Sequence, residues 1–316
     1  MNRKIFFRAD ADMSIGYGHF IRTLALADML KDTFECVFFT QSPTDYQRKE
    51  MERVCHFVEL PGDDRRFDFF LDYLSGEEIV VLDNYFYTTD YQLQIKNKGC
   101  KLVCIDDMHD KHYVADVVVN HGLAESQEFD CEPYTRLCLG LDWSLLRKPF
   151  LLPIHATKRL DRIIVCFGGS DPQRLSDKVV TMLLQLSVEQ EIVVILGDTA
   201  YLSEENRQRV TIMHNLTAWQ MADLFETSMY GIMPASSVRM EAVSRGLKTI
   251  AGYFVDNQRI GFDRSLALQD IVPIYNYAEL TIERLSSAME QLRDFHFVIP
   301  DYSRVPDNYI NLFASL

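Results

Sequence analysis

The sequence predicts an α/β protein made of two doubly wound domains, each with a mostly parallel sheet covered by helices. The first observation is length, because 316 residues are enough for two domains of ordinary size. The second is that short β-branched or aromatic runs alternate with segments of helical period, as in βαβ units. The third is that this alternation stops once near the middle of the chain and then starts again.

The first half of the chain contains strands and helices in regular alternation. Its apolar runs are nearly continuous, which favours strands buried on both faces and therefore a parallel sheet. The predicted strands are Lys4–Arg8, Glu35–Thr40, His56–Leu60, Ile79–Asp83, Lys101–Asp106, Val117–Asn120 and Leu137–Leu141. The predicted helices are Phe20–Lys31, Thr44–Val54, Arg66–Leu74 and Thr88–Lys98.

The segment Arg147–Arg159 is the predicted linker. Pro149 and Pro153 interrupt the pattern there, and basic residues make both ends of the segment polar. We therefore assign residues 1–150 to an N-terminal domain and residues 158–295 to a C-terminal domain.

The alternation of strands and helices returns after the linker. The predicted strands are Arg162–Phe167, Ile192–Leu196, Thr211–Met213, Tyr230–Met233, Thr249–Phe254 and Val272–Tyr275. The predicted helices are Gln173–Leu186, Trp219–Thr227, Val238–Arg245, Gln258–Gln269 and Tyr277–Leu292. In sheets of this kind, ligands bind beyond the carboxyl ends of the strands.

Residues 296–316 form a separate C-terminal segment. Ile299–Tyr302 and Val305–Asp307 each contain a proline, and we expect both stretches to break the helical pattern. Tyr309–Leu316 is the candidate for a last helix that crosses back to the N-terminal domain.

Composition and charge limit the partners and the compartment. The chain has 32 Lys and Arg against 46 Asp and Glu, and the net charge of −14 opposes binding to nucleic acid or to an anionic membrane. We also predict no membrane insertion, because the chain contains no long uncharged apolar stretch and no signal peptide. The seven cysteines are odd in number, and most lie in apolar runs, which indicates buried thiols and a cytoplasmic protein.

The strongest local signal is the loop that joins the first predicted strand to the first predicted helix. Gly16 and Gly18 let the backbone approach a ligand, and the free amides of the helix start favour an anion there. The same field disfavours an imidazolium, so His19 suits a general base; a histidine that merely caps the helix is an equal alternative. Asp10 and Asp12 could orient His19 or contact a sugar, or they could be surface carboxylates.

Two loops in the second half have features of phosphate sites. Gly168-Gly169-Ser170-Asp171 lies between a predicted strand and a predicted helix, and it offers backbone and hydroxyl donors to a phosphate. Taken alone, this loop is better explained as an ordinary turn capped by Ser170 or Asp171.

The second of these loops begins a helix at Ser236 and Ser237. Glu241 lies one helical turn deeper on the same face, where its carboxylate could accept both hydroxyls of a ribose. A capped surface helix with a solvated glutamate is the alternative.

A metal site would have to use Asp106, Asp107, His109 and His112. No second group of ligands has suitable spacing, and the acidic pair more simply ends a strand. We therefore predict neither a metal nor another cofactor.

Together these motifs resemble the UDP-sugar hydrolases of pseudaminic acid biosynthesis. The matching motifs, in order, are Gly16-Tyr17-Gly18-His19-x-x-Arg22, Gly168-Gly169-Ser170-Asp171, Ser236-Ser237-x-x-x-Glu241-Ala242 and Asp256-Asn257-Gln258. The resemblance extends to about Gln269 and includes Val81–Tyr85 and Ile105–Asp107. It implies the GT-B architecture of MurG-type glycosyltransferases, in which two doubly wound Rossmann-type domains face each other across a cleft.

The resemblance also implies an activity. The substrate would be UDP-2,4-diacetamido-2,4,6-trideoxy-β-L-altrose, hydrolysed to the free sugar and UDP with inversion and without a metal. His19 would activate water, helped by Tyr85 and Asp10. UDP would lie on the C-terminal domain, with its diphosphate near Gly169 and Ser236 and its ribose on Glu241. The other implied substrate or UDP contacts are Gly16, Gly18, Arg22, Gly168, Ser170, Asp171, Ser237, Asn257 and Gln258.

Some positions differ from the family pattern, and two other functions fit the same motifs. Asn84 stands where the family has histidine, and Asn120-His121-Gly122 stands where it has Asn-x-Asn, so the identity of the sugar stays open. One alternative is a GT-B glycosyltransferase that uses a UDP-sugar donor, although the acidic chain shows no patch for a lipid acceptor. The other is a non-catalytic nucleotide-sugar-binding protein, which would not need a base at His19.

Overall fold

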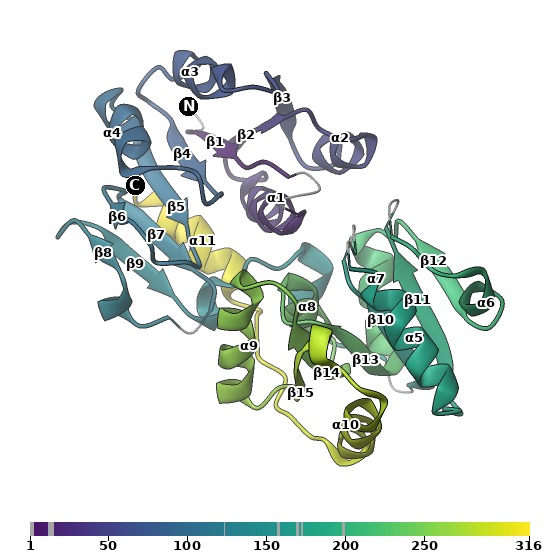
Figure 1. The fold of residues 1–316 in the computed structure, drawn as a ribbon. Helices are drawn as coiled ribbons and strands as arrows, with labels where there is room; N and C mark the ends of the chain where they lie inside the picture. The colour runs from purple at the N-terminus through teal and green to yellow at the C-terminus, as the bar shows by residue number, and fades with distance from the viewer. Residues whose placement is uncertain are drawn as a thin grey trace. The chain divides into compact units, whose positions relative to one another are not determined.

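The computed structural model describes residues 3–11, 16–122, 124–156, 159–168, 171, 173–197 and 200–316. The chain divides into two compact units, each with its own parallel sheet (Figure 1). Unit 1 comprises Met1–Lys148 and Tyr302–Leu316, and unit 2 comprises Pro149–Asp301. The change of unit at Lys148 falls inside the segment predicted to be a linker.

The seven-stranded sheet of unit 1 has the order β3-β2-β1-β4-β5-β7-β9, and its strands are parallel. The strands are β1 (Lys4–Arg8), β2 (Glu35–Gln41), β3 (His56–Leu60), β4 (Ile79–Leu82), β5 (Lys101–Ile105), β7 (Val117–Asn120) and β9 (Arg136–Leu139). The helices between them are α1 (Gly18–Leu30), α2 (Asp45–Glu52), α3 (Arg65–Asp72) and α4 (Thr89–Asn97). The strand order reverses between β1 and β4, so their carboxyl ends form a topological switch point.

Unit 1 also contains short elements that the sequence did not indicate. They are β6 (His112–Tyr113) and β8 (Asp130–Cys131), which pair with each other, and the 3₁₀ turns η1 (Ser126–Glu128) and η2 (Leu141–Trp143). A two-residue strand or a single 3₁₀ turn has no periodicity, so an analysis based on hydrophobic pattern misses it.

The last helix, α11 (Val305–Ala314), yellow in Figure 1, belongs to unit 1, where it contacts α1 and η2, both far from it in the sequence. The Tyr309 hydroxyl donates to the Trp143 carbonyl at 2.6 Å, and the Phe313 ring contacts the Phe34 ring. The prediction that Val305–Asp307 breaks the helix is wrong. Proline is tolerated in the first turn of a helix, where its missing N–H is not needed, and α11 begins there.

The six-stranded sheet of unit 2 has the order β12-β11-β10-β13-β14-β15 and is also parallel. The strands are β10 (Leu160–Cys166), β11 (Glu191–Leu196), β12 (Thr211–His214), β13 (Ser228–Pro234), β14 (Lys248–Tyr253) and β15 (Val272–Asn276). The helices are α5 (Leu175–Gln185), α6 (Glu204–Arg207), α7 (Ala218–Thr227), α8 (Ser237–Ser244), α9 (Asn257–Leu268) and α10 (Ile282–Asp294). The switch point of this sheet lies between β10 and β13.

The predicted helix Tyr277–Leu292 is wrong over its first turn. The chain forms a separate 3₁₀ turn, η4 (Tyr277–Glu279), and α10 begins only at Ile282. Thr281 is the N-cap of α10, because its hydroxyl accepts a hydrogen bond from the Arg284 amide at 3.3 Å. Tyr277 is fully buried, and its hydroxyl donates to the Met233 carbonyl at 2.7 Å.

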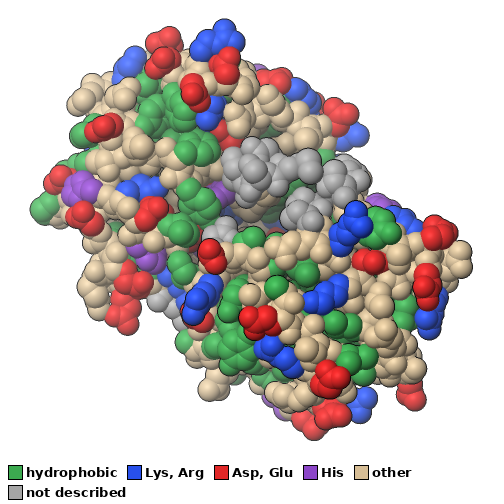
Figure 2. Space-filling view, viewed as in Figure 1, with side chains coloured by type: hydrophobic (Ala, Val, Ile, Leu, Met, Phe, Trp, Pro, Cys, Tyr) green, Lys and Arg blue, Asp and Glu red, His purple; other side chains and the backbone are tan. Residues whose placement is uncertain are grey.

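Each unit has its own hydrophobic core around its central strands. Phe39, Val80 and Leu102 belong to the core of unit 1, and Val194 and Ile232 to that of unit 2. Over the face shown in Figure 2, acidic and basic side chains are interspersed. Within the described ranges, no helix is both long enough and apolar enough to cross a membrane.

The cysteines are free thiols, and five of the seven are buried. Burial raises the pKa of the Cys36 thiol to about 12, so this thiol stays protonated at neutral pH. It is therefore a poor nucleophile.

Candidate active site

His19 lies in the first turn of α1, after the loop that follows β1. Gly16 has φ 78°, a conformation that favours glycine, and a Cβ on Gly16 or Gly18 would meet no described atom within 4 Å. The described residues therefore leave room beside these two glycines. The N-cap residue Tyr17 supplies no side-chain cap, so the first amides of α1 are not covered from there.

The His19 side chain bonds to Asp83 instead of capping its own helix. Nδ1 of His19 lies 2.7 Å from Oδ1 of Asp83, and the two side chains are 5% and 0% exposed. Burial alone raises the pKa of Asp83, but Arg22 and His19 more than offset this and hold it below its usual value. Nη2 of Arg22 lies 3.1 Å from the same Nδ1, but the shorter contact is with the ionised carboxylate, which only accepts. We therefore assign the Nδ1–H to the hydrogen bond with Asp83, which leaves Nε2 as the nitrogen that can take a proton.

Asp83 was not among the predicted site residues. It follows β4 directly, and β4 lies beside β1 at the switch point. The signal available in the sequence was an aspartate at the end of an apolar strand, two residues before Tyr85. The family resemblance implied a role for Tyr85 and none for Asp83.

Arg22 holds two carboxylates and is itself buried. Its Nε and Nη2 donate to Asp83 at 2.7 and 2.6 Å, and its Nη1 donates to Oδ2 of Asp107 at 2.8 Å. The Thr23 hydroxyl adds a further donor to Asp83 at 2.8 Å. The predicted role of Arg22 was a substrate contact; in this structure its guanidinium supports the Asp83–His19 pair.

Tyr85 lies beside His19, as expected for a residue of the same site. The two ring centroids are 4.5 Å apart, and the planes are nearly perpendicular. Lys111, on the loop after β5, donates from Nζ to the Tyr85 carbonyl at 2.8 Å. The site in unit 1 therefore draws on α1, the end of β4 and the loop after β5.

Asp10 has different partners from those predicted. Its Oδ2 accepts from Nη2 of Arg8 at 2.6 Å, and its Oδ1 accepts from the Gln41 amide at 2.8 Å. Its own amide donates to Oδ1 of Asn84 at 2.7 Å, and Asp10 is fully buried. Asp10 therefore joins the ends of β1, β2 and β4, and the residue that orients His19 is Asp83. Asp12 lies outside the described residues.

The first loop of unit 2 begins at Gly168, after β10. Gly168 has φ 86°, and a Cβ there would meet no atom of the described residues within 4 Å. Gly169 and Ser170 lie outside the described residues. The Asp171 carboxylate accepts from the amides of Leu175 and Ser176, both at 2.8 Å, so it caps α5, as the alternative explanation of this loop has it.

The second loop of unit 2 leads from β13 into α8. Ser236 is the N-cap residue, but its side chain makes no cap hydrogen bond, which leaves this described helix start without a side-chain cap. Glu241, one turn further along α8, is only 4% exposed. The neighbouring strand β14 leads into α9, where Oε1 of Gln258 accepts from the Phe254 amide at 3.1 Å.

The predicted UDP residues of unit 2 therefore come from neighbouring strands. Strands β10, β13 and β14 are adjacent, so Gly168, Ser236 and Asn257 lie at the carboxyl edge of the same part of the sheet. The Asn257 side chain lies outside the described part of the structure. A helix start without a side-chain cap, beside a glycine turn at a switch point, is an arrangement in which α/β sheets bind phosphate groups.

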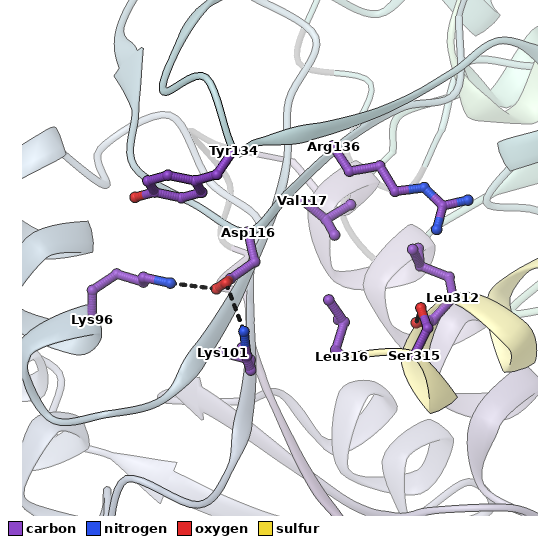
Figure 3. Close-up of a pocket in the computed structure, with 9 residues that line it drawn as sticks. All are labelled: Lys96, Lys101, Asp116, Val117, Tyr134, Arg136, Leu312, Ser315 and Leu316. Atoms are coloured by element: carbon purple, nitrogen blue, oxygen red, sulfur yellow. Dashed lines mark hydrogen bonds and ion pairs between the residues drawn. The ribbon is translucent and has the colours of Figure 1, made fainter.

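Unit 1 has a hollow at the amino ends of its strands, with a volume of about 660 Å³. Figure 3 shows Lys96 and Lys101 on either side of Asp116, with Nζ–Oδ distances of 2.6 and 3.2 Å. Lys101 begins β5 and Arg136 begins β9, so this hollow lies at the amino ends of the strands. The described residues that line it include no histidine or cysteine, and it shares none of them with the His19 site.

The acidic and histidine residues after β5 do not form a metal site. Oδ2 of Asp106 accepts from the amides of Met108 and His109, at 3.2 and 2.8 Å. His112 contacts Asp130 and Glu132 through its two ring nitrogens. Across the described part of the chain, no three His, Cys, Asp or Glu side chains are grouped so that they could hold a metal ion.

Comparison with known sequences finds distant relatives. No family model matches the chain. It is 26% identical over 287 residues to the Methanocaldococcus jannaschii protein MJ1062, covering 82% of this chain and 57% of that protein, so it spans little more than half of that relative. It is 24% identical over 276 residues to the UDP-2,4-diacetamido-2,4,6-trideoxy-β-L-altropyranose hydrolase of Campylobacter jejuni, covering 81% of this chain and 93% of that enzyme.

Comparison with solved structures identifies the fold. MurG of Acinetobacter baumannii matches with a TM-score of 0.69 at 12% identity, over 99% of this chain and 100% of that one. A UDP-glucosyltransferase of Polygonum tinctorium matches with a TM-score of 0.64 at 10% identity, over 100% of this chain and 94% of that one. The chain therefore has the GT-B fold with two parallel Rossmann-like sheets, and the predicted fold class is confirmed.

Proposed function

We propose that this chain hydrolyses a UDP-linked 2,4-diacetamido-trideoxy-hexose to UDP and the free sugar, as a cytoplasmic step of nonulosonic (pseudaminic) acid biosynthesis. The observation that carries the proposal is the buried Asp83–His19 pair at the switch point of unit 1. The distant relationship to the C. jejuni hydrolase supports the same reaction.

His19 is the general base in this proposal. Asp83 holds the Nδ1–H, and Nε2 accepts a proton from a water molecule as the water oxygen bonds to the anomeric carbon. The bond from that carbon to the phosphate oxygen breaks, and its electron pair leaves with UDP. Water attacks from the face opposite the leaving group, so the configuration inverts. Tyr85, whose ring is packed against that of His19, helps to place the sugar or the water.

Unit 2 binds UDP in this proposal. The diphosphate meets the amides of the Gly168–Ser170 turn and of the start of α8 at Ser236 and Ser237, where the helix dipole offsets its charge without a metal. The Glu241 carboxylate accepts hydrogen bonds from the ribose hydroxyls. Asn257 lies at the start of the neighbouring helix α9. Asp171 does not contact UDP in this proposal; its carboxylate accepts a hydrogen bond from the Leu175 amide and so holds the start of α5 in place.

A glycosyltransferase is the second candidate, because MurG and the UDP-glucosyltransferase share the fold. A protein that only binds a nucleotide sugar would have no need of a histidine oriented by a buried carboxylate, and this favours an enzyme over a binding protein.

Incubation of the purified protein with UDP-2,4-diacetamido-2,4,6-trideoxy-β-L-altrose, without any acceptor, tests the proposal. We expect release of UDP, a free sugar of inverted configuration by NMR, and, in ¹⁸O-water, label in the sugar and not in UDP. The matched control is His19→Asn, which has a polar side chain but no base. Release of UDP only after an acceptor is added would identify a transferase, and binding without release in either case would identify a binding protein.

A further inference from the structure

The charges around His19 do not balance when its ring is neutral. The described charged or titratable side chains that face His19 or its partners are Arg22 on α1, Asp83 and Tyr85 after β4, and Asp107 and Lys111 after β5. Lys111, which donates to the Tyr85 carbonyl, also pairs with Asp110 at 3.3 Å, and this pair adds no net charge. Two carboxylates and one guanidinium leave one excess negative charge. A proton on His19 would make the cluster neutral.

Asp83 alone cannot provide that excess charge. It already receives two hydrogen bonds from Arg22, one from Thr23 and the contact with His19, so a full positive charge lies against it before His19 takes a proton. An imidazolium in this buried place would then face a neutral ion pair. Burying a charge without a compensating opposite charge is unfavourable in free energy, so Asp83 alone would not stabilise this imidazolium.

Asp107 is the second carboxylate. Its Oδ2 accepts from Nη1 of Arg22 at 2.8 Å, on the side of the guanidinium away from Nε. Its Oδ1 is buried and makes no hydrogen bond to any described residue. Burial raises the pKa of Asp107, but Arg22 outweighs this and holds it below the usual value, so the carboxylate is charged at neutral pH.

We propose that Asp107 is a positioning residue for the hydrolysis: acting through Arg22, it supplies the negative charge that compensates the proton that His19 takes from water. The inference rests on the proposed function and adds a role for Asp107, which the sequence indicated only as a possible metal ligand and as part of the matching segment Ile105–Asp107. Arg22 joins the two carboxylates, so the charge change at His19 reaches Asp107 through fixed hydrogen bonds.

Asp107→Asn tests the proposal, because an asparagine keeps an oxygen acceptor for Arg22 and removes only the charge. We expect the acid-side midpoint of the pH profile of kcat to fall by about one unit, as for the loss of a charge several ångströms away. We expect kcat on the plateau to fall by roughly three- to tenfold, because the base becomes weaker, with KM changed by less than about twofold. The midpoint of the His19 ring titration, followed by NMR without substrate, should move by the same amount.

Two variants separate charge from shape. Asp107→Glu keeps the charge and should leave both midpoints close to those of the unchanged protein. Asp28→Asn removes an aspartate charge from the same helix as His19, about 13 Å further along it, and should move neither midpoint. Asp28 pairs with Lys31 and has no part in the site.

An unchanged midpoint in Asp107→Asn, with the fold intact by circular dichroism, would overturn the proposal. So would an Asp107→Glu midpoint that moves as far as that of Asp107→Asn. If the unchanged protein releases no UDP, the proposed function fails, whereas the ring titration still decides whether Asp107 is coupled to His19.

Discussion

Replacing Asp83 by asparagine should show how much of the activity depends on the orientation of the His19 ring, because His19 itself stays in place. Both Asp83 oxygens only accept: Oδ1 contacts His19 and Arg22, and Oδ2 contacts Arg22 and Thr23. An asparagine at this position has to direct its NH₂ group toward one of the two sets of partners, all of which donate hydrogen bonds to Asp83. If the amide group faces His19, Nδ1 must become the acceptor, the proton moves to Nε2, and the base is lost.

The expected size of both effects follows from these contacts. Loss of a correctly oriented base should lower kcat by about 10²- to 10⁴-fold, with little change in KM. The free energy of unfolding should fall by about 2–4 kcal/mol, because Arg22 loses one buried charged partner and keeps the other, Asp107. A domain with roughly 5–15 kcal/mol of stability would still be folded at 25 °C.

The pH dependence of stability gives an independent check. The pKa of Asp83 is lower in the folded protein than in the unfolded chain, so its contribution to stability is fully present above the unfolded value. It is lost as the pH falls below about 4, where the unfolded carboxyl takes up a proton and the folded one does not. The stability difference between the unchanged protein and Asp83→Asn should therefore shrink in that range.

Steady-state kinetics and urea unfolding at several pH values measure these effects. Asp28→Asn is the matched control. Loss of its partly exposed pair with Lys31 should lower the free energy of unfolding by less than about 1 kcal/mol and leave kcat unchanged. An Asp83→Asn variant with the kcat of the unchanged protein would refute the argument that Asp83 orients a catalytic His19.

Three further predictions concern the base, the ribose and the metal. His19→Asn should lower kcat by about 10²- to 10⁴-fold and leave UDP affinity, measured by calorimetry, almost unchanged, since UDP is assigned to unit 2; a variant that keeps most of its kcat would contradict the base role. Glu241→Ala removes a charged hydrogen-bond partner worth about 1.5–3 kcal/mol, so UDP should bind at least about tenfold more weakly, and equal affinity would exclude the ribose contact. Activity should persist in EDTA; loss that Mg²⁺ restores would show that a metal carries the diphosphate charge.

The fold class and the places where a site could lie were predictable from local patterns in the sequence. Continuous apolar strands such as β4 and β7 indicate parallel sheets, and both are buried along their whole length. Gly16, Gly168 and Ser236 mark turns where a strand leads into a helix, and such local signals depend only on neighbouring residues. Local context indicates His19, the family resemblance adds Tyr85, and the two lie side by side in the structure.

Which side chains meet depends on how the strands pair and pack. Asp83 lies 64 positions after His19, and they meet because β4 pairs with β1, the strand before α1, while β2 and β3 lie on the other side. Asp10 is nearer to His19 in the sequence, yet its hydrogen bonds are with Arg8 and Asn84. A side chain's partner depends on strand order and register, which arise from the packing of the whole sheet. No local spacing in the chain contains that information.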